Sequence, residues 1–247
     1  YLEHSGIRYA CHQLEGIKPS IHALHGFLGT GLDYSLLAKH LPNQVEAWDL
    51  IGHGHTSVAV EEENYGLTEQ LAFLKQAIPK GSILMGYSMG GRLALQFACH
   101  YPEHLQGLIL VSSTPGIHSD EDRNQRVSWD QHMADQVLDL GMDSFLELWN
   151  KLPIIQSQSH IDPEHRKHML NLRRLQSVVG ISNSMRFFGA GTMTSCWEML
   201  TSLDIPVLLI VGEQDEKYRE LALTMFDMLD NASLGVIPQA GHCAHLE

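Results

Sequence analysis

The segment LMGYSMGGRLAL, residues 84–95, places a serine in a turn between two regular elements. The overlapping stretch SILMGYS at 82–88 is typical of a buried strand, and GRLALQFACHY at 91–101 is typical of an amphipathic helix. GYSMG at 86–90 matches G-x-S-x-G, a pattern in which a strained turn lifts the serine hydroxyl clear of the backbone. Glycines leave room for that turn, and the following helix directs its first amides at the reaction centre. We therefore predict that Ser88 is a nucleophile or a base, although a glycine-rich turn with an incidental serine also fits the pentapeptide alone.

The rest of the chain alternates between short apolar runs and helical patterns. Buried strands are predicted at 20–26, 45–50, 82–88, 107–113, 206–215 and 233–238, with an amphipathic helix at 67–78 between two of them. This alternation indicates an α/β fold with a mostly parallel sheet and helices on both faces. Residues 118–203 are helical and polar-rich without a convincing strand, so we predict a helical cap inserted into a core formed by 1–117 and 204–247.

A catalytic serine needs a histidine, and the histidine needs an acid that holds its tautomer. In this architecture they follow in the order serine, aspartate, histidine, each just past a strand. LLIVGEQDEKY at 208–218 offers Asp215 or Glu213 as the acid. GVIPQAGHCAHLE at 235–247 offers His242 or His245, and we favour His242 because it directly follows a glycine on the loop.

Two further segments complete the predicted catalytic centre. The loop LHGFLGTG at 24–31 follows a strong strand, and such a loop supplies one oxyanion-hole amide, here from Phe27. Met89, directly after the serine, supplies the other amide. We interpret His25 in the same loop as a structural residue of the turn. Arg92 follows Ser88 by four residues, so it shares a helix face with the serine and can reach an anion held there, or else extend to solvent.

Composition limits the classes of function. The 247 residues contain 16 Lys and Arg against 29 Asp and Glu, a net charge of −13 that argues against binding nucleic acid or an anionic membrane. There is no apolar run of about 18 residues and no signal-peptide pattern. Four scattered cysteines, Cys11, Cys99, Cys196 and Cys243, suggest reduced thiols in a cytoplasmic protein. GHGHT at 52–56 is interpreted as a tight turn, and we expect no metal site.

Taken together, LHGFLGTG, GYSMGGRLAL, GEQDEKY and GHCAHLE resemble the α/β hydrolases. More narrowly, they resemble the 2-succinyl-6-hydroxy-2,4-cyclohexadiene-1-carboxylate (SHCHC) synthases of menaquinone biosynthesis, in which GYSMGGR is the more specific motif. The segments EDRNQR (121–126), LELW (146–149), NLRR (171–174) and FFGAGTMTSCW (187–197) resemble the cap of that family.

The resemblance implies a carbon–oxygen lyase rather than a hydrolase. Members of that family eliminate pyruvate from 2-succinyl-5-enolpyruvyl-6-hydroxy-3-cyclohexene-1-carboxylate (SEPHCHC), a small molecule with three carboxylates. His242, oriented by Asp215, would activate Ser88 to remove a proton α to the succinyl carbonyl. No metal or organic cofactor is implied.

The resemblance also implies a set of substrate-binding residues. Arg92, Arg126 and Arg173 would clamp the carboxylates, and Tyr87 and Trp149 would line the pocket, although ordinary packing within the cap also explains Trp149. The neighbouring Arg123 and Arg174 could replace the two cap arginines if the helical register differs. A serine hydrolase of an ester or C–C bond in an anionic substrate uses the same triad and remains the alternative, as does a non-catalytic receptor on this fold.

Overall fold

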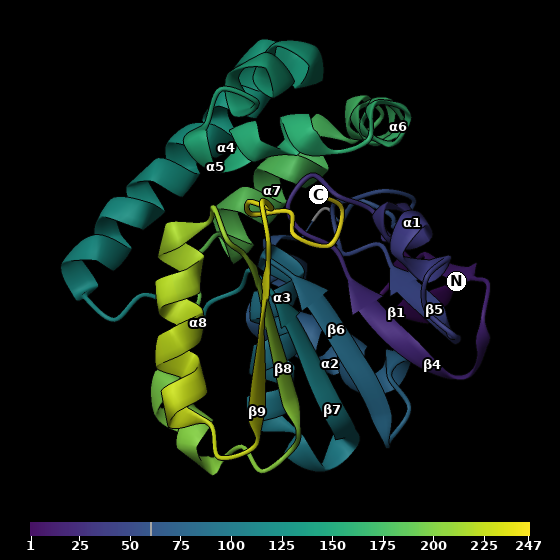
Figure 1. Ribbon diagram of the computed structural model, residues 1–247. Coiled ribbons are helices and arrows are strands. Elements are labelled where there is room, and N and C mark those ends of the chain that lie inside the picture. The colour runs from purple at the N-terminus through teal and green to yellow at the C-terminus, as the bar shows by residue number, and fades with distance from the viewer. Residues whose placement is uncertain (60) are drawn as a thin grey trace.

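The computed structural model describes residues 1–59 and 61–247. The strands of its main sheet are β3 (Cys11–Leu14), β4 (Ile17–Leu24), β5 (Asn43–Trp48), β6 (Ser82–Tyr87), β7 (Leu105–Val111), β8 (Val207–Gly212) and β9 (Ala232–Ile237). Their spatial order is β3-β5-β4-β6-β7-β8-β9, and Figure 1 labels the strands from β4 to β9. Neighbouring strands are parallel except for β3 against β5. The mostly parallel sheet predicted from the strand–helix alternation is therefore confirmed.

The N-terminal strands were not predicted from the sequence. β1 (Leu2–His4) and β2 (Ile7–Tyr9) form a separate antiparallel pair, and β3 continues from it to become an edge strand of the main sheet. Each of these strands is three or four residues long. Segments of this length show too few alternations for a period of two to be recognised.

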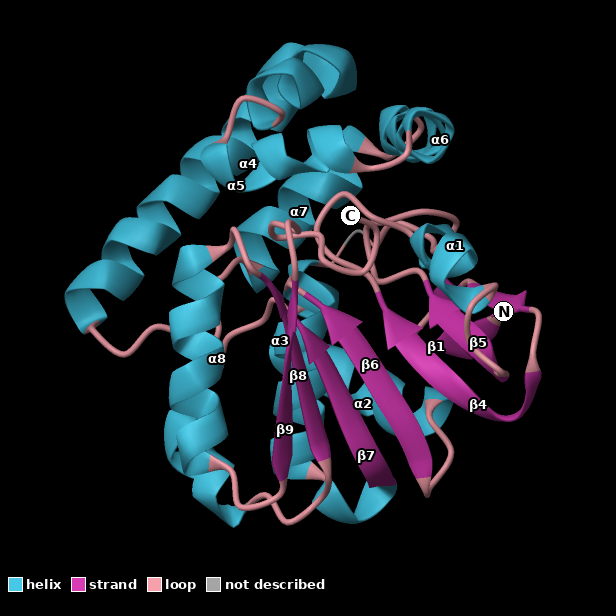
Figure 2. Cartoon of the chain, viewed as in Figure 1, coloured by secondary structure: helices cyan, strands magenta, loops and turns pink. Residues whose placement is uncertain are grey.

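Helices pack along the sheet. This first group contains α1 (Ser35–Ala38), α2 (Leu67–Ala77), α3 (Met89–His100) and α8 (Glu216–Met228), with short 3-10 helices at Gly31–Tyr34, Glu62–Tyr65, Pro102–His104 and Trp197–Ser202. Figure 2 shows α2 and α3 behind the strands. Helix α3 is buried on all sides from Met89 to Ala98, as expected for a helix whose apolar residues are not confined to one stripe. This burial fixes the residues that follow Ser88.

A second group of helices lies above the carboxyl edge of the sheet (Figure 1). It contains α4 (Asp120–Trp149), α5 (Pro153–Gln156), α6 (Pro163–Arg174) and α7 (Val178–Phe188), with a 3-10 helix at Ser157–His160. Gly141 interrupts α4 with φ 74° and ψ 170°. Buried side chains of α4 and α7, including Phe145 and Met185, form a separate apolar cluster that also contains Leu28 of the core. These helices fall inside 118–203, and the division of the chain at those limits stays a prediction.

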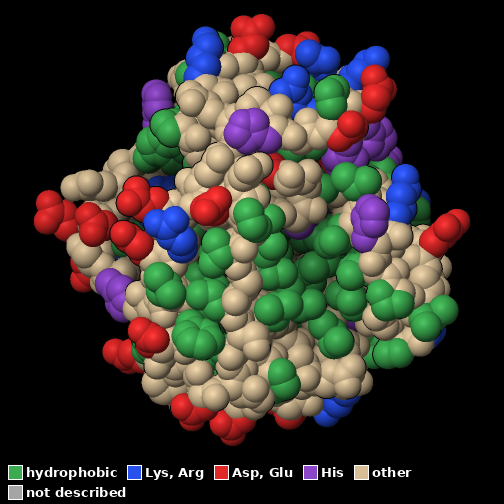
Figure 3. All heavy atoms as spheres, viewed as in Figure 1, with side chains coloured by type: hydrophobic (Ala, Val, Ile, Leu, Met, Phe, Trp, Pro, Cys, Tyr) green, Lys and Arg blue, Asp and Glu red, His purple; other side chains and the backbone are tan. Residues whose placement is uncertain are grey.

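One face of the sheet is rich in accessible apolar side chains. Figure 3 shows hydrophobic groups gathered over the front of the molecule, where Figure 1 places β6 to β9. Leu208 on β8 is 37% exposed, and Ile109 on β7 is half-buried. In the described ranges, no helix is both long and apolar enough to cross a membrane.

Candidate active site

Ser88 occupies a strained turn between β6 and α3. Its backbone has φ 50° and ψ −109°, a conformation that side chains with a Cβ rarely adopt. Its amide donates a hydrogen bond to the carbonyl of Val111 at 2.9 Å, and its carbonyl accepts from the amide of Arg92 at 2.9 Å. The buried strand and helix on either side therefore hold the strain in place, and such strain is common at functional sites.

The glycines beside this serine allow close approach of the backbone. A Cβ on Gly90 would collide with the carbonyl oxygens of Leu24 and His25 on β4 and the loop that follows it. A Cβ on Gly86 would collide with the carbonyl of Gly90. The motif therefore positions the start of α3 directly against the end of β4, where the predicted oxyanion loop begins.

The structure brings the three predicted triad residues together. The Nε2 atom of His242 lies 3.0 Å from Ser88 Oγ, and its Nδ1 atom lies 2.6 Å from Asp215 Oδ2. Asp215 follows β8 at the start of α8, and His242 lies on the loop after β9. The ring of Tyr218 packs against His242 with centroids 4.4 Å apart. An imidazole whose Nδ1 donates to a carboxylate has its Nε2 available to accept the serine proton.

The two alternatives considered for the triad make other contacts. The side chain of Glu213 accepts a hydrogen bond from the amide of Gln239 at 2.9 Å, which fixes the loop leading to His242. His245 packs against Tyr87 at 4.5 Å between ring centroids. Burial lowers the pKa of His245 to about 3, so its ring is neutral at ordinary pH.

The loop after β4 lies beside the serine. Gly26, Phe27 and Met89 line one cavity together with Ser88. His25 is held by the backbone on both ring nitrogens: Nδ1 donates to the carbonyl of Gly26 at 2.7 Å, and Nε2 accepts from the amide of Leu50 at 2.9 Å. Because both nitrogens are engaged, His25 has the structural role expected of it. The contribution of Phe27 and Met89 to an oxyanion hole stays a prediction.

Ser88 opens into a cavity of about 360 Å³ between the sheet edge and the helices above it. Its volume is in the range of small-molecule sites. Four cationic side chains line it: Arg92, Arg126, Arg173 and Lys217. On a chain with a net charge of −13, this concentration of positive charge is local and favours an anionic ligand.

Arg92 is a buried cation one helical turn after the serine. Its side chain is 8% exposed, and it donates to the carbonyl of Phe188 at 3.3 Å and contacts the sulfur of Met193 at 3.8 Å. Within the described residues it forms no ion pair with a carboxylate. Burial, aided by repulsion from Arg126, lowers the pKa of Arg92 to about 10, so it stays charged at neutral pH. A buried charge without a counter-ion is costly unless a ligand supplies one.

The other two predicted arginines also line the cavity. Arg126 on α4 pairs with the buried carboxylate of Asp130 at 2.7 Å and stands over the ring of Trp129 at 4.7 Å. Arg173 on α6 is 5% exposed and donates to the side chain of Gln158 at 3.0 Å.

Their sequence neighbours point to the surface instead. Arg123 pairs with exposed Asp120 at 2.6 Å, and Arg174 pairs with exposed Asp143 at 3.3 Å. The helical register therefore directs Arg126 and Arg173, rather than these neighbours, to the cavity.

The predicted aromatic residues serve packing and lining together. Tyr87 is in contact with the rings of both His242 and His245, with centroid distances of 5.5 and 4.5 Å. Trp149 is 8% exposed and packs 5.0 Å from the ring of Phe27. Both line the cavity.

Sequence reasoning missed several cavity residues. Lys217 and Tyr218 follow Asp215 at the start of α8, so their place beside a predicted catalytic residue was the available signal. Asp33, which belongs to the capping box of the short helix after the 24–31 loop, gave no such signal. Burial raises the pKa of Asp33 to about 6, and the positive charge of Arg173 opposes that rise.

Comparison with known proteins identifies the family. A family model described as the α/β hydrolase fold matches residues 19–247. A putative SHCHC synthase of Bacillus subtilis (strain 168) is 34% identical, with 98% of this chain and 90% of the relative covered. The chain belongs to the SHCHC synthase family of α/β hydrolases. The resemblance read from its motifs is confirmed.

Other members of this family agree with the assignment. The SHCHC synthase of Photorhabdus laumondii is 30% identical over 95% of this chain and 84% of the relative. The structure of MenH from S. aureus matches with a TM-score of 0.87 and 30% identity, covering 97% of this chain and 92% of that one. A thermophilic esterase from Thermogutta terrifontis matches with a TM-score of 0.76 at 23% identity, which shows the shared fold alone.

Proposed function

We propose that this protein is an SHCHC synthase that eliminates pyruvate from SEPHCHC. The observation that carries the proposal is the buried guanidinium of Arg92, which has no carboxylate partner among the described residues and lies one helical turn from a serine in triad geometry. A hydrolase of neutral esters has no use for this charge, whereas a substrate with three carboxylates supplies its counter-ion. The family assignment supports the same substrate, a small molecule.

The triad acts as a base in this reaction. Asp215 accepts the Nδ1 proton of His242 in a hydrogen bond, so Nε2 accepts the proton of Ser88 Oγ. The serine oxygen then removes the proton α to the succinyl carbonyl of the substrate. Negative charge moves to that carbonyl oxygen, and the amides of Phe27 and Met89 stabilise it in the oxyanion hole.

The second half of the reaction breaks one C–O bond. Electrons from the enolate move through the ring double bond and expel enolpyruvate. The proton taken from the substrate is returned from the serine–histidine pair as enolpyruvate becomes pyruvate. Bonds and protons balance without a redox step, so the chemistry requires no oxidant or reductant.

The helices above the sheet complete the site in this proposal. We assign 118–203 to a cap that contributes Arg126, Arg173 and Trp149 to the cavity. Guanidinium groups bind carboxylates through two parallel hydrogen bonds, so arginines from two directions fix the substrate over Ser88.

We also place the reaction in the cytoplasm, in line with four cysteines that form no disulfide.

The direct test mixes the purified protein with freshly prepared SEPHCHC and follows pyruvate and SHCHC together against an enzyme-free control. We expect both products at equal rates, with a loss of about a thousandfold or more in Ser88→Ala. Ser128→Ala, an exposed serine on α4, is the matched control and retains full activity. A rate equal to the enzyme-free control, together with Ser88-dependent cleavage of simple esters, would instead identify a serine hydrolase.

A further inference from the structure

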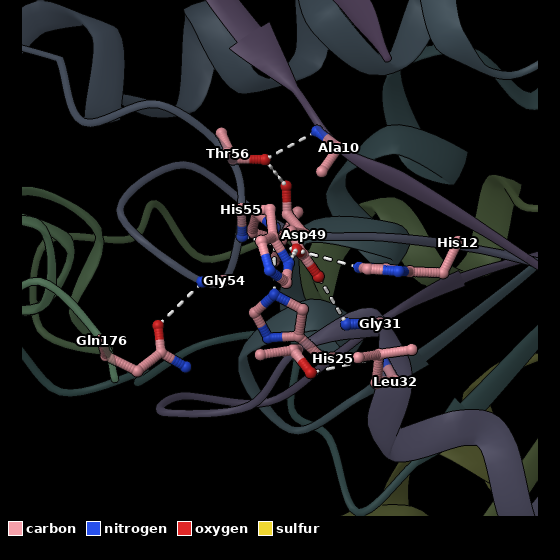
Figure 4. A network of polar contacts seen from close by, with 12 residues as sticks. Ala10, His12, His25, Gly31, Leu32, Asp49, Gly54, His55, Thr56 and Gln176 are labelled. Carbon is pink, nitrogen blue, oxygen red and sulfur yellow. Dashed lines mark hydrogen bonds and ion pairs between the residues drawn. The ribbon is translucent and has the colours of Figure 1, made fainter. Parts of the chain in front are cut away.

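Two histidines and an aspartate meet away from the catalytic cavity. His12 lies on the edge strand β3, Asp49 directly follows β5, and His55 lies in the turn at 52–56. One potential ligand atom from each lies within 4.8 Å of the others. Figure 4 shows the His12 and His55 rings on either side of the Asp49 carboxylate. The sequence indicated a turn at 52–56, but only the antiparallel pairing of β3 with β5 brings His12 to it.

Asp49 is a fixed anion at the centre of this group. One carboxylate oxygen accepts from the amide of Gly31 at 2.7 Å, and the other accepts from the amide of His55 at 2.7 Å. Burial alone would raise the pKa of Asp49, but the hydrogen bonds from His12 and these amides lower it to about 2. The side chain is 0% exposed, so the carboxylate cannot turn away to water.

The distances suit a tetrahedral metal ion. Zinc binds histidine nitrogen and carboxylate oxygen at about 2.0–2.2 Å, so ligand atoms of a tetrahedral site are roughly 3.3 Å apart. Asp49 Oδ2 lies 3.0 Å from His12 Nε2 and 3.6 Å from His55 Nδ1, one value on each side of that separation. His55 is 60% exposed, so its ring is free to rotate inward and the fourth position faces water.

We propose that His12, Asp49 and His55 bind one divalent transition-metal ion of the zinc type, with water as the fourth ligand. The ion takes the place of the hydrogen bond between His12 Nε2 and Asp49 Oδ2. Because Asp49 also accepts from Gly31, at the end of the 24–31 loop, the bound ion ties the edge strand to the segment that carries Phe27. The site lies outside the lining of the catalytic cavity.

Calorimetric titration of chelator-treated protein with Zn²⁺ tests this proposal. We expect one site, with the dissociation constant raised at least about tenfold in His12→Gln and in His55→Gln, since even loss of an outer hydrogen-bond partner commonly costs that much. Glutamine retains an amide that donates to Asp49, so both variants should fold, and circular dichroism checks this. His132→Gln, an exposed histidine on α4, is the control and should bind as the parent does.

The melting temperature is a second readout, which distinguishes Zn²⁺ binding at this site from Zn²⁺ binding to other histidines. Saturating Zn²⁺ should raise the melting temperature of the parent and of His132→Gln, but not that of His55→Gln. The proposal is overturned by an absence of saturable binding, or by binding that persists unchanged in His12→Gln or His55→Gln. The latter result would assign the ion to another group, such as the catalytic histidine.

Discussion

Replacement of Arg92 by methionine should change activity and stability in opposite directions. Methionine keeps an unbranched apolar chain beside Phe188 but removes the guanidinium that we propose binds a substrate carboxylate. Removal of one partner from a buried charge pair costs about 2–5 kcal/mol of binding. At about 1.4 kcal/mol per factor of ten, kcat/KM for SEPHCHC should fall by roughly thirtyfold to a few thousandfold.

Stability without substrate should rise in the same variant. Burial and repulsion from Arg126 lower the pKa of Arg92 to about 10, and a change of this size corresponds to a cost of about 3 kcal/mol for holding the charge away from water and beside another cation. Loss of the hydrogen bond to the Phe188 carbonyl offsets about 1 kcal/mol of that relief. The net gain of about 1–2 kcal/mol should raise the melting temperature by roughly 2–8 °C in a chain of this size.

Calorimetry and steady-state kinetics on the same preparations measure both effects. Arg186→Met is the matched control, because Arg186 on α7 pairs with exposed Asp135 and should shift stability by less than about 1 kcal/mol without loss of activity. A variant Arg92→Met that is both inactive and less stable would refute the reasoning, since it would make the arginine a structural residue. Full activity in that variant would refute the proposed clamp.

Three further outcomes are expected. Asp215→Asn should lower kcat by about four orders of magnitude with little change in thermal stability, because the amide favours the wrong tautomer of the catalytic imidazole; unchanged kcat would exclude the triad role. His245 has a pKa lowered to about 3, so its contribution to stability is present above the unfolded pKa near 6.5 and is lost as pH falls toward 3. His245→Gln should therefore show a shallower loss of stability than the parent in urea titrations between pH 6.5 and 4, and parallel curves would contradict this. Gly54→Ala should lower the free energy of unfolding, measured by urea denaturation, more than Gly6→Ala does. Both glycines have positive φ, but only a Cβ at Gly54 would collide with the Asp49 carboxylate. Equal losses in the two variants would show that the collision with Asp49 adds nothing to the backbone strain.

Local chemistry explains how much could be predicted from the sequence. The turn around Ser88 and the order of the triad could be recognised because each depends on residues adjacent in the chain and on the strands before them. The choice of Arg126 over Arg123 depends on helical register, which a pattern of charges does not fix. The place of Asp33 in the cavity depends on how the short helix after β4 packs, and the place of His12 beside a distant turn depends on the pairing of β3 with β5. Neighbouring residues give no signal for either.

The catalytic residues and the cap arginines lie on different groups of elements, and this arrangement affects how members of the family evolve. Ser88, Asp215 and His242 all stand at the ends of sheet elements, whereas Arg126 and Arg173 stand on α4 and α6. In the proposed function, mutations in these helices would alter which molecule is bound without moving Ser88, Asp215 or His242. Lineages that share this scaffold can thus diverge in substrate while inheriting one acid–base centre, since function resides in sites built on a fold rather than in the fold itself.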